Sequence, residues 1–515
     1  MAKSKFKPLS FSTTMRNPER IGKFLNCVLP YENQILTNDV INGIIYNIIS
    51  KKIYITNYEK IKYKGINEED DIILSREEVH DILINSPQKH KEAGFESGWS
   101  SRFATWFSFS QELGFITYEM NKPITISQTG HMLIDALNEE TPNNEKIANI
   151  FLNAMIKYHT NNPYKKNLNS NIPLVLLLNV LKLLKEDQEE NGAGVFRKEL
   201  SLFICWPDDD ANKLYQTIKE IRKVYHYSYS DDFMYEKCLN ILNSDNTVYF
   251  KKEKICGEAI DEYIRKMRIT GIISLRGNGR FLDFNNLEIE KINYILENYK
   301  NVKSFESKEE YSNYIGQIDN NILEIETNPK IDIRTLRLKK LNEIADTYSK
   351  ETINNELRIV CKKRYSSDPL FKYIDEPARL EFLTSVALIQ NFTGLQVEPN
   401  YVIDDEGLPT STAGGGVPDI LCRDTEYDNL VEVTLMCGRS DQVNNEIIPI
   451  RRHLLKLRDE NNKSFAIFLA PIIHEDTKES ANWYKYRENL DIIPLDIEEF
   501  IYKISNLSKI YMVLE

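Results

Sequence analysis

The stretch that decides the fold lies in the last third of the chain and reads Val417-Pro418-Asp419-Ile420-Leu421-Cys422-Arg423-Asp424-Thr425-Glu426-Tyr427-Asp428-Asn429-Leu430-Val431-Glu432-Val433-Thr434-Leu435. Residues 418–422 have the composition of a short strand with a proline at its N-terminal edge, where a missing N–H is tolerated. The polar run 423–429 predicts a turn, and the β-branched and apolar residues of 430–435 favour a second strand. In such a hairpin Asp419 and Glu432 can meet on one face. Alternation along the strand places Thr434 on the same side as Glu432.

Two carboxylates that converge from adjacent strands form a site of hard oxygen ligands. Mg²⁺ prefers such ligands, and it usually binds one or two carboxylates together with substrate phosphate. The pattern Pro418-Asp419, then Glu432-Val433-Thr434, resembles the PD-(D/E)XK nuclease motif, which has a lysine where this chain has Thr434. An ordinary solvent-facing hairpin would have the same outline, so the rest of the chain must decide between them.

Three features around the hairpin favour a functional site. Glu432 lies in an otherwise apolar strand, where a buried carboxylate needs a reason. The helix-like run 376–388 offers Glu381 as a third acid, and 464–470 predicts a buried strand of the same sheet. A helix over 441–458 carries Glu446 and contains Pro449, which we expect to kink it. The order helix, strand, strand, helix, strand predicts an α/β domain with a mixed sheet over 361–515.

Composition sets the broad class. The 515 residues predict several domains, and a hydrophobic content of 42% argues for packed cores rather than disorder. No apolar run has the length of a membrane span, so no membrane association is expected. Seven scattered cysteines without zinc-type spacing predict reduced thiols and a cytoplasmic location. A net charge of −12 does not exclude nucleic acid, because a duplex responds to local basic patches.

The N-terminal part repeats one arrangement of elements twice. A helix over 99–113, strands near 115 and 124–126, and a helix over 131–137 have the layout of a winged helix-turn-helix. A helix over 258–270 followed by short strands at 272–275 and 281–284 repeats it. The fold class is therefore predicted as multidomain α+β. We expect winged-helix-like modules at 1–160 and 161–300, a helical linker at 301–360 and an α/β domain at 361–515.

Cations near these elements are the candidate contacts to double-stranded DNA, because arginine and lysine supply most phosphate and guanine contacts. They lie in the opening segment, on the first predicted helix-turn-helix, and on the helix and hairpin tip of the second. The candidates are Arg16, Arg20, Arg102, Arg265, Lys266, Arg268, Arg276 and Arg280.

Two segments together identify a family. The opening Pro8-Leu9-Ser10-Phe11-Ser12-Thr13-Thr14-Met15-Arg16-Asn17-Pro18-Glu19-Arg20-Ile21, with the hairpin motif at 417–434, resembles the AlwI family of type IIS restriction endonucleases. The resemblance extends over essentially the whole chain, and its opening segment is more specific than the nuclease motif. It implies a Mg²⁺-dependent nuclease that recognises a short asymmetric duplex site, such as GGATC, and cuts a few bases outside it.

The resemblance also assigns roles to residues. Asp419 and Glu432 would bind the metal, with Glu381 as the helix glutamate that completes the set. Thr434 in place of the motif lysine leaves the cation that activates water unassigned. Gln442, Glu446 and Lys456 on the following helix are the alternatives.

Two other interpretations stay open from the sequence. The chain could be a winged-helix DNA-binding regulator with an inactive nuclease-like domain, or a structure-specific nuclease such as a resolvase. The intact trio Glu381, Asp419 and Glu432 argues against the first, and two recognition modules argue against the second. One trio cuts one phosphodiester at a time, and no heptad run predicts a permanent dimer. We therefore expect a monomer in solution whose nuclease domain pairs transiently with a second copy for the second strand.

Overall fold

The computed structural model describes residues 6–11, 19–64, 72–139, 143–165, 167–190, 194–326, 332–364 and 366–514. The chain forms two compact units that interleave in sequence. The first contains 1–48, 87–139 and 145–331, and the second contains 49–86, 140–144 and 332–515. The four-domain division predicted from the sequence stays a prediction.

The second unit is built on a five-stranded sheet in the order β12-β11-β10-β9-β6. The predicted hairpin is its centre: β9 (Ile420–Arg423) pairs antiparallel with β10 (Asp428–Val433), with Leu421 opposite Leu430. β11 (Phe465–Ala470) runs parallel to β10, and β12 (Ile492–Asp496) runs parallel to β11. β6 (Gln396–Pro399) adds antiparallel to β9. The prediction of a mixed sheet is confirmed.

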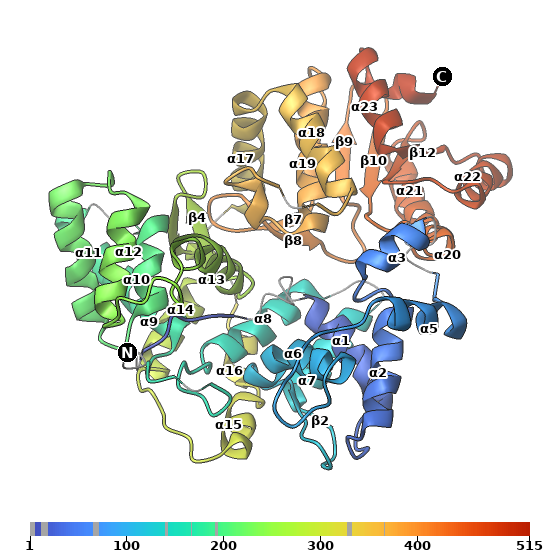
Figure 1. The fold of residues 1–515 in the computed structure, drawn as a ribbon. Coiled ribbons are helices and arrows are strands. Elements are labelled where there is room, and N and C mark those ends of the chain that lie inside the picture. Colours follow the sequence, from blue (N-terminus) through green and yellow to red (C-terminus); the bar gives the residue numbers. More distant parts are fainter. Residues whose placement is uncertain are drawn as a thin grey trace. The chain divides into compact units, whose positions relative to one another are not determined.

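Helices cover both faces of this sheet (Figure 1). α18 (Lys350–Cys361) and α19 (Glu376–Asn391) lie on one side, and α21 (Ile448–Glu460) and α22 (Glu475–Glu488) lie on the other. α21 and α22 bury an apolar cluster against the strands, including Leu430, Leu454 and Phe468. α19 carries buried residues all round, from Ala378 to Leu388, which fits a helix covered on several sides.

Two features of this unit were not predicted from the sequence. The helix predicted over 441–458 is present as one continuous helical run of α20 (Arg439–Asp441), a π-helical turn (Gln442–Ile447) and α21, and the π-helical turn within it was not predicted. Pro449 lies shortly after this turn, and the kink expected at it stays a prediction. The hairpin of β7 (Tyr401–Ile403) and β8 (Pro409–Ala413) was not predicted, because its strands are short and partly polar.

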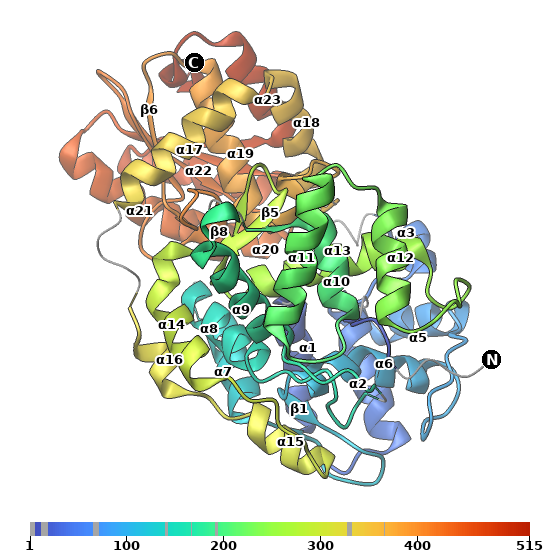
Figure 2. The same cartoon turned by 90° about the vertical axis from the view of Figure 1, so that its left-hand side faces the viewer.

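The helices and strands of the two predicted repeats are present in the first unit, and their winged-helix arrangement stays a prediction. In the first, α6 (Trp99–Glu112) leads into β1 (Ile116–Thr117), β2 (Thr125–Ile126) and α7 (Gln128–Asn138). In the second, β3 (Val195–Phe196), β4 (Ile273–Arg276) and β5 (Phe281–Phe284) form a sheet in the order β3-β5-β4. α10 (Leu200–Cys205) packs against α12 (Asp231–Ile241) and α13 (Ala259–Arg268), near α11 (Ala211–Tyr225) in Figure 2.

The remaining helices are mostly short and amphipathic, and no helix in the described ranges is long and apolar enough to cross a membrane. Within the described residues of 289–361, helices follow one another, and the linker role expected for 301–360 stays a prediction. The bounds are α1 (Glu19–Val28), α2 (Asn38–Ser50), α3 (Asn57–Lys62), α5 (Arg76–Asn85), α8 (Asn144–Met155), α9 (Pro173–Glu186), α14 (Ile289–Asn298), α15 (Lys308–Ile315), α16 (Asn320–Glu324), α17 (Ile333–Thr347) and α23 (Ile497–Asn506). The prediction of a mixed α+β chain is confirmed.

Candidate functional site

The hairpin brings its two acids together at the end of the sheet. Asp419 lies one residue before β9, and Glu432 lies near the end of β10. The backbone N–H of Asp419 donates to Glu432 Oε2 at 3.2 Å, and the backbone N–H of Val433 donates to Asp419 Oδ2 at 2.8 Å. Each acid is therefore held by the strand that carries the other.

Glu381 joins them from α19, where its side chain is only 3% exposed. The backbone N–H of Ala413, the last residue of β8, donates to Glu381 Oε2 at 3.0 Å. Burial raises the pKa of Glu381 to about 8, and repulsion from Glu432 adds to the effect. The Ala413 hydrogen bond and the nearby charge of Arg337 act in the opposite direction.

Asp419 feels the same crowding of negative charge. Burial raises the pKa of Asp419 well above its usual range, and repulsion from Glu381 and Glu432 adds to this shift. The N–H of Val433 partly offsets it, while Glu446 contributes further repulsion. Because carboxylates at one site disfavour each other's ionisation, this mutual repulsion places Glu381, Asp419 and Glu432 in one electrostatic cluster.

Thr434 and Glu446 form the border of this cluster. Thr434, at the motif position of lysine, is 8% exposed, and its Oγ1 accepts a hydrogen bond from the N–H of Met436 at 3.1 Å. Glu446 lies in the π-helical turn. Burial raises the pKa of Glu446 to about 7, with a lowering contribution from its hydrogen bond with Thr434 and a raising one from Glu432. Single π-helical turns inside helices are frequent at functional sites.

His453 is a member of the cluster that the sequence analysis did not single out. It lies on α21, and its Nδ1 is 2.7 Å from Glu432 Oε1. Both oxygens of Glu432 are thus in hydrogen bonds, one with His453 and one with the N–H of Asp419. A lone histidine in a polar helix has no spacing that points to a partner on a strand, so only the fold could identify it.

The other two alternatives for the missing lysine lie elsewhere. Gln442 is buried and internally bonded: its Nε2 donates to the carbonyl of Ile472 at 2.6 Å, and its Oε1 accepts from Thr477 Oγ1 at 2.9 Å. Lys456 is exposed on α21. Of the three alternatives, Glu446 is the one that interacts with Thr434 and Glu432.

The donor set suits a hard divalent cation. Three acids with carboxylate oxygens are crowded together, and positive charge between them would relieve the repulsion that raises the pKa values of Glu381 and Asp419. Within the described ranges, no group of three such side chains is already arranged to enclose a metal ion. The chemistry of the oxygens fits the ion.

The predicted DNA-contacting cations have different surroundings. Arg20 and Arg280 are exposed, and Arg265 is partly exposed. Arg102 lies with its guanidinium 5.6 Å from the ring centroid of Trp106 and its Nη1 3.0 Å from His90 Nε2. Arg16 lies outside the described residues.

Three cations of the second repeat are engaged inside the first unit. Lys266 is 1% exposed, and its Nζ lies 3.3 Å from Glu262 Oε2 and 5.5 Å from the ring centroid of Phe109. Arg268 is 8% exposed. Arg276 is partly exposed and donates through Nη2 to the carbonyl of Phe284 at 2.9 Å. Because Lys266 and Arg268 are buried, they are not available to contact a DNA duplex in this structure.

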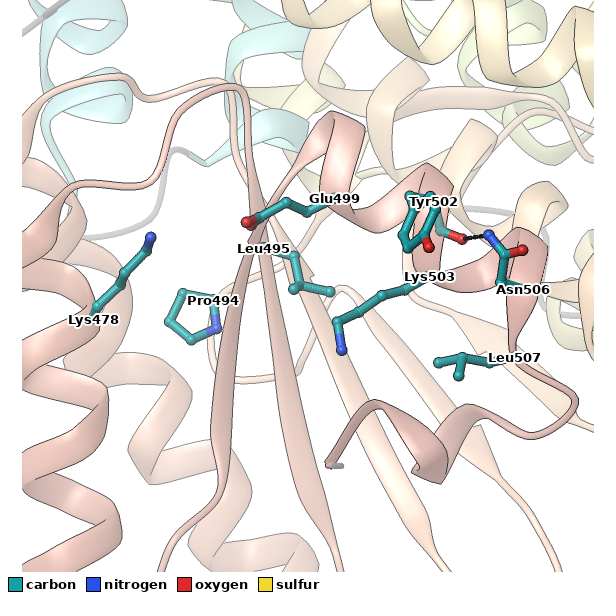
Figure 3. Close-up of a pocket in the computed structure, with 8 residues that line it drawn as sticks. All are labelled: Lys478, Pro494, Leu495, Glu499, Tyr502, Lys503, Asn506 and Leu507. Carbon is teal, nitrogen blue, oxygen red and sulfur yellow. Dashed lines mark hydrogen bonds between the residues drawn. The ribbon is translucent and has the colours of Figure 1, made fainter.

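A cavity of about 530 Å³ lies beside β12, and Figure 3 shows the residues that line it. Neither Asp419 nor Glu432 is among the described residues that line it. Pro494 lies at the middle of this edge strand, where proline prevents pairing with a further strand. The lining residues are Lys478, Pro494, Leu495, Glu499, Tyr502, Lys503, Asn506 and Leu507.

Comparison with known families decides the class of this site. The model of the AlwI restriction endonuclease family matches residues 111–362 and 332–503, which together cover most of the chain. The chain belongs to the AlwI restriction endonuclease family. This membership makes it a type IIS site-specific DNA nuclease. AlwI-family membership implies DNA as partner, and restriction endonucleases of this kind typically use divalent metal ions.

Solved structures similar to this AlwI-family chain are also restriction endonucleases. The small subunit of the heterodimeric restriction endonuclease R.BspD6I is 24% identical over 30% of this chain and 77% of that chain, with a TM-score of 0.25. Restriction endonuclease FokI is 12% identical over 95% of this chain and 94% of that one, and its DNA-bound form is 13% identical over 97% and 96%, both with TM-scores of 0.24. At these TM-scores none of the three defines the fold of the AlwI-family chain. No curated protein matches its sequence.

Proposed function

We propose that this chain is a Mg²⁺-dependent endonuclease that recognises a short asymmetric duplex site, such as GGATC, and hydrolyses phosphodiesters a few bases outside it. Winged-helix-like modules in the N-terminal part read the site, and residues 361–515 cut. The observation that carries the proposal is the meeting of Asp419, Glu432 and Glu381 at one end of the sheet. A DNA-binding regulator with an inactive nuclease-like domain is not favoured, because such a protein has no use for three mutually repelling acids, two of them buried.

Asp419 and Glu432 are the residues that hold Mg²⁺, and Glu381 completes the acidic set from α19. Bound Mg²⁺ supplies two effects: it lowers the pKa of water, and it stabilises negative charge on the phosphate and the leaving oxygen. The chain fixes the direction of its acids in advance. Val433 holds Asp419 through Oδ2, and His453 holds Glu432 through Oε1.

Glu446 takes the part of the missing motif lysine as the proton acceptor, with Thr434 as its hydrogen-bond partner. A carboxyl group whose pKa is raised to about 7 is well matched to proton transfer near neutral pH. It differs from a lysine in adding negative charge near an anionic substrate, so we assign the compensating positive charge to the metal. His453 orients Glu432 and does not carry the proton in this scheme.

DNA binding is assigned to cations that reach solvent. Arg20, Arg102, Arg265, Arg276 and Arg280 remain proposed contacts, as does Arg16. The buried Lys266 and Arg268 are withdrawn from the proposal. Arg280 is the strongest of these, because it is exposed at the turn between β4 and β5, the tip that enters a groove in winged-helix proteins.

One experiment tests the recognition sequence, the position of the cut and the metal requirement together. Plasmid DNA is digested with purified full-length protein in Mg²⁺ or in EDTA, and the ends are mapped by run-off sequencing. We expect ends at a constant offset outside one short sequence, in Mg²⁺ alone. Ends in EDTA, or ends without a shared sequence, would contradict the proposal.

A further inference from the structure

Glu381 and Asp419 come from different elements. One short corner of the chain, between β6 and β7, contacts the segments that carry both acids. The corner consists of Pro399, Asn400 and Tyr401. Asn400 contacts the segment that carries Asp419: its backbone N–H donates to the carbonyl of Asp419 at 2.8 Å, and its Nδ2 donates to the carbonyl of Pro418 at 2.7 Å. The side chain of Asn400 thus fixes the backbone from which Asp419 projects.

The same corner reaches Glu381 through its next residue. Tyr401 is fully buried and pairs in register with Ala413, whose backbone N–H binds the Glu381 carboxylate. The Tyr401 ring also packs edge-on against Phe382, the neighbour of Glu381 on α19, with ring centroids 5.8 Å apart. A shift of the corner would therefore move both acids, and would move them by different amounts.

Arg337 of α17 holds the corner from outside. Its Nη1 donates to the carbonyl of Pro399 at 2.6 Å, and its guanidinium lies 5.6 Å from the centroid of the Tyr401 ring. Pairing with a carbonyl while covering an aromatic ring is a geometry that a planar guanidinium achieves and an ammonium does not. Arg334, one turn earlier on α17, pairs with Glu398 instead, and its side chain is 69% exposed.

We propose that Asn400 and Arg337 are positioning residues of the nuclease centre, which lock the 399–401 corner and so set the separation of Glu381 and Asp419 for a divalent cation. The inference rests on the proposed function of these two acids. Groups that orient metal ligands from outside typically change metal affinity or activity by about 10- to 100-fold when they are removed. Neither residue touches the substrate in this scheme: Asn400 acts through the geometry of the acids, and Arg337 acts through that geometry and through its charge near Glu381.

The test uses the full-length protein and Mn²⁺ as the probe. Binding of Mn²⁺ in the absence of DNA is measured from the electron paramagnetic resonance signal of the free ion. Single-turnover cleavage is measured against Mg²⁺ concentration, and thermal unfolding reports on folding. The variants are Asn400→Ala, Arg337→Met and Arg337→Lys. Arg334→Met is the matched control on the same helix, and Asp419→Ala is the reference for loss of a ligand.

We expect Asn400→Ala and Arg337→Met each to weaken Mn²⁺ binding by about 10-fold or more and to raise the half-saturating Mg²⁺ concentration similarly. Cleavage at saturating Mg²⁺ should recover, because all the acids are present. Arg337→Lys should fall between Arg337→Met and wild type, and Arg334→Met should equal wild type. If Arg337→Met does not fold, Asn400→Ala, which removes one hydrogen bond at a partly exposed position, decides the outcome.

Wild-type Mn²⁺ affinity in Asn400→Ala together with a lower unfolding temperature would overturn the inference, because the corner would then serve folding alone. Failure of the proposed function has a different signature. In that case Asp419→Ala itself would bind Mn²⁺ like the wild type.

Discussion

The acidic cluster of the second unit contrasts with two buried ion pairs of the first unit. In the second unit, acids distant in sequence, at 381, 419, 432 and 446, repel one another in one cluster. In the first unit, buried charges are paired: Arg222 contacts Glu199 at 2.6 Å, and Lys266 contacts Glu262 at 3.3 Å. The acidic cluster of the second unit thus keeps its charges unbalanced, whereas these buried pairs of the first unit neutralise each other.

This difference shows how buried charges can be used to locate a functional site. Buried charges of opposite sign satisfy each other and need no ligand, so they serve the fold. Buried charges of one sign raise each other's pKa values, as they do for Glu381 and Asp419, and they are stabilised when a cation arrives. This criterion supports the proposal that the second unit contains the chemical centre and that the first meets DNA through its exposed cations.

The largest expected effect comes from a substitution in the acidic cluster of the second unit. Glu432→Ala should lower the cleavage rate by more than about 1000-fold, because metal stabilisation of several kcal/mol is lost with its ligand. Single-turnover cleavage of a labelled duplex measures this, with sequence-specific binding in Ca²⁺ as the control for folding. Cleavage at near wild-type rate would mean that the acidic cluster is structural.

The second effect follows from the presence of one cluster in one chain. Because the two scissile phosphates of a duplex have opposite polarity, we propose that a second copy supplies the second cut. Linear product should therefore rise faster than in proportion to enzyme concentration, while nicking stays proportional to it. An enzyme titration that follows nicked and linear plasmid over time measures both. Linear product that is first order in enzyme, without a nicked intermediate, would contradict the scheme.

The sequence predicted the elements of the second unit well because its strands are short apolar runs with clear turns. The hairpin, the strand at Phe465–Ala470 and the helix bearing Glu381 all lie where expected. Contacts that depend on the third dimension were not predictable. His453 and Asn400 carry no local signal of their roles, since each acts on a residue in another element.

The sequence was less informative about the DNA-contacting cations. The helix at Ala259–Arg268 was expected, but its sequence does not state which face is buried when arginine and lysine occur on both. Long cationic side chains can line a core when an acid lies one turn away, as Glu262 does for Lys266. The hydrophobic period and the helix propensity of the sequence locate such a helix. Tertiary packing decides which of its charged side chains reach solvent.

Two substitutions in the first unit compare an exposed cation with a buried one, and we expect each to have a moderate effect. Arg280→Ala should weaken DNA binding and reduce the slope of log affinity against log salt by about 1, the loss of one phosphate contact. Lys266→Met should leave that slope unchanged and lower the unfolding temperature, because it breaks a buried ion pair. Fluorescence anisotropy across a salt series and thermal unfolding measure the two. A changed salt slope in Lys266→Met would return this residue to the DNA interface.

The smallest effect concerns pH. The pKa of Glu446 in the folded protein is about 7, above its usual value of 4.5, so the folded state binds more protons than the unfolded state between these values. Its contribution to stability is therefore full below about pH 4.5 and is lost as pH rises through about 7. Glu446→Gln cannot ionise, so without divalent metal its unfolding free energy should fall less between pH 5 and pH 8. We expect a difference on the order of 1 kcal/mol after solvent screening. If the unfolding free energy of wild type and Glu446→Gln changed equally with pH, Glu446 would not belong to the acidic cluster.

The most direct test of the central claim separates recognition from cutting in one protein. Wild type and Asp419→Asn are each bound to a duplex in Ca²⁺ and footprinted, Mg²⁺ is then added, and the ends are sequenced. The account predicts the same protected site for both proteins, with ends outside that site for the wild type alone. Ends at the same offset and a comparable rate from Asp419→Asn would contradict it, because the chemistry would then lie outside the acidic cluster.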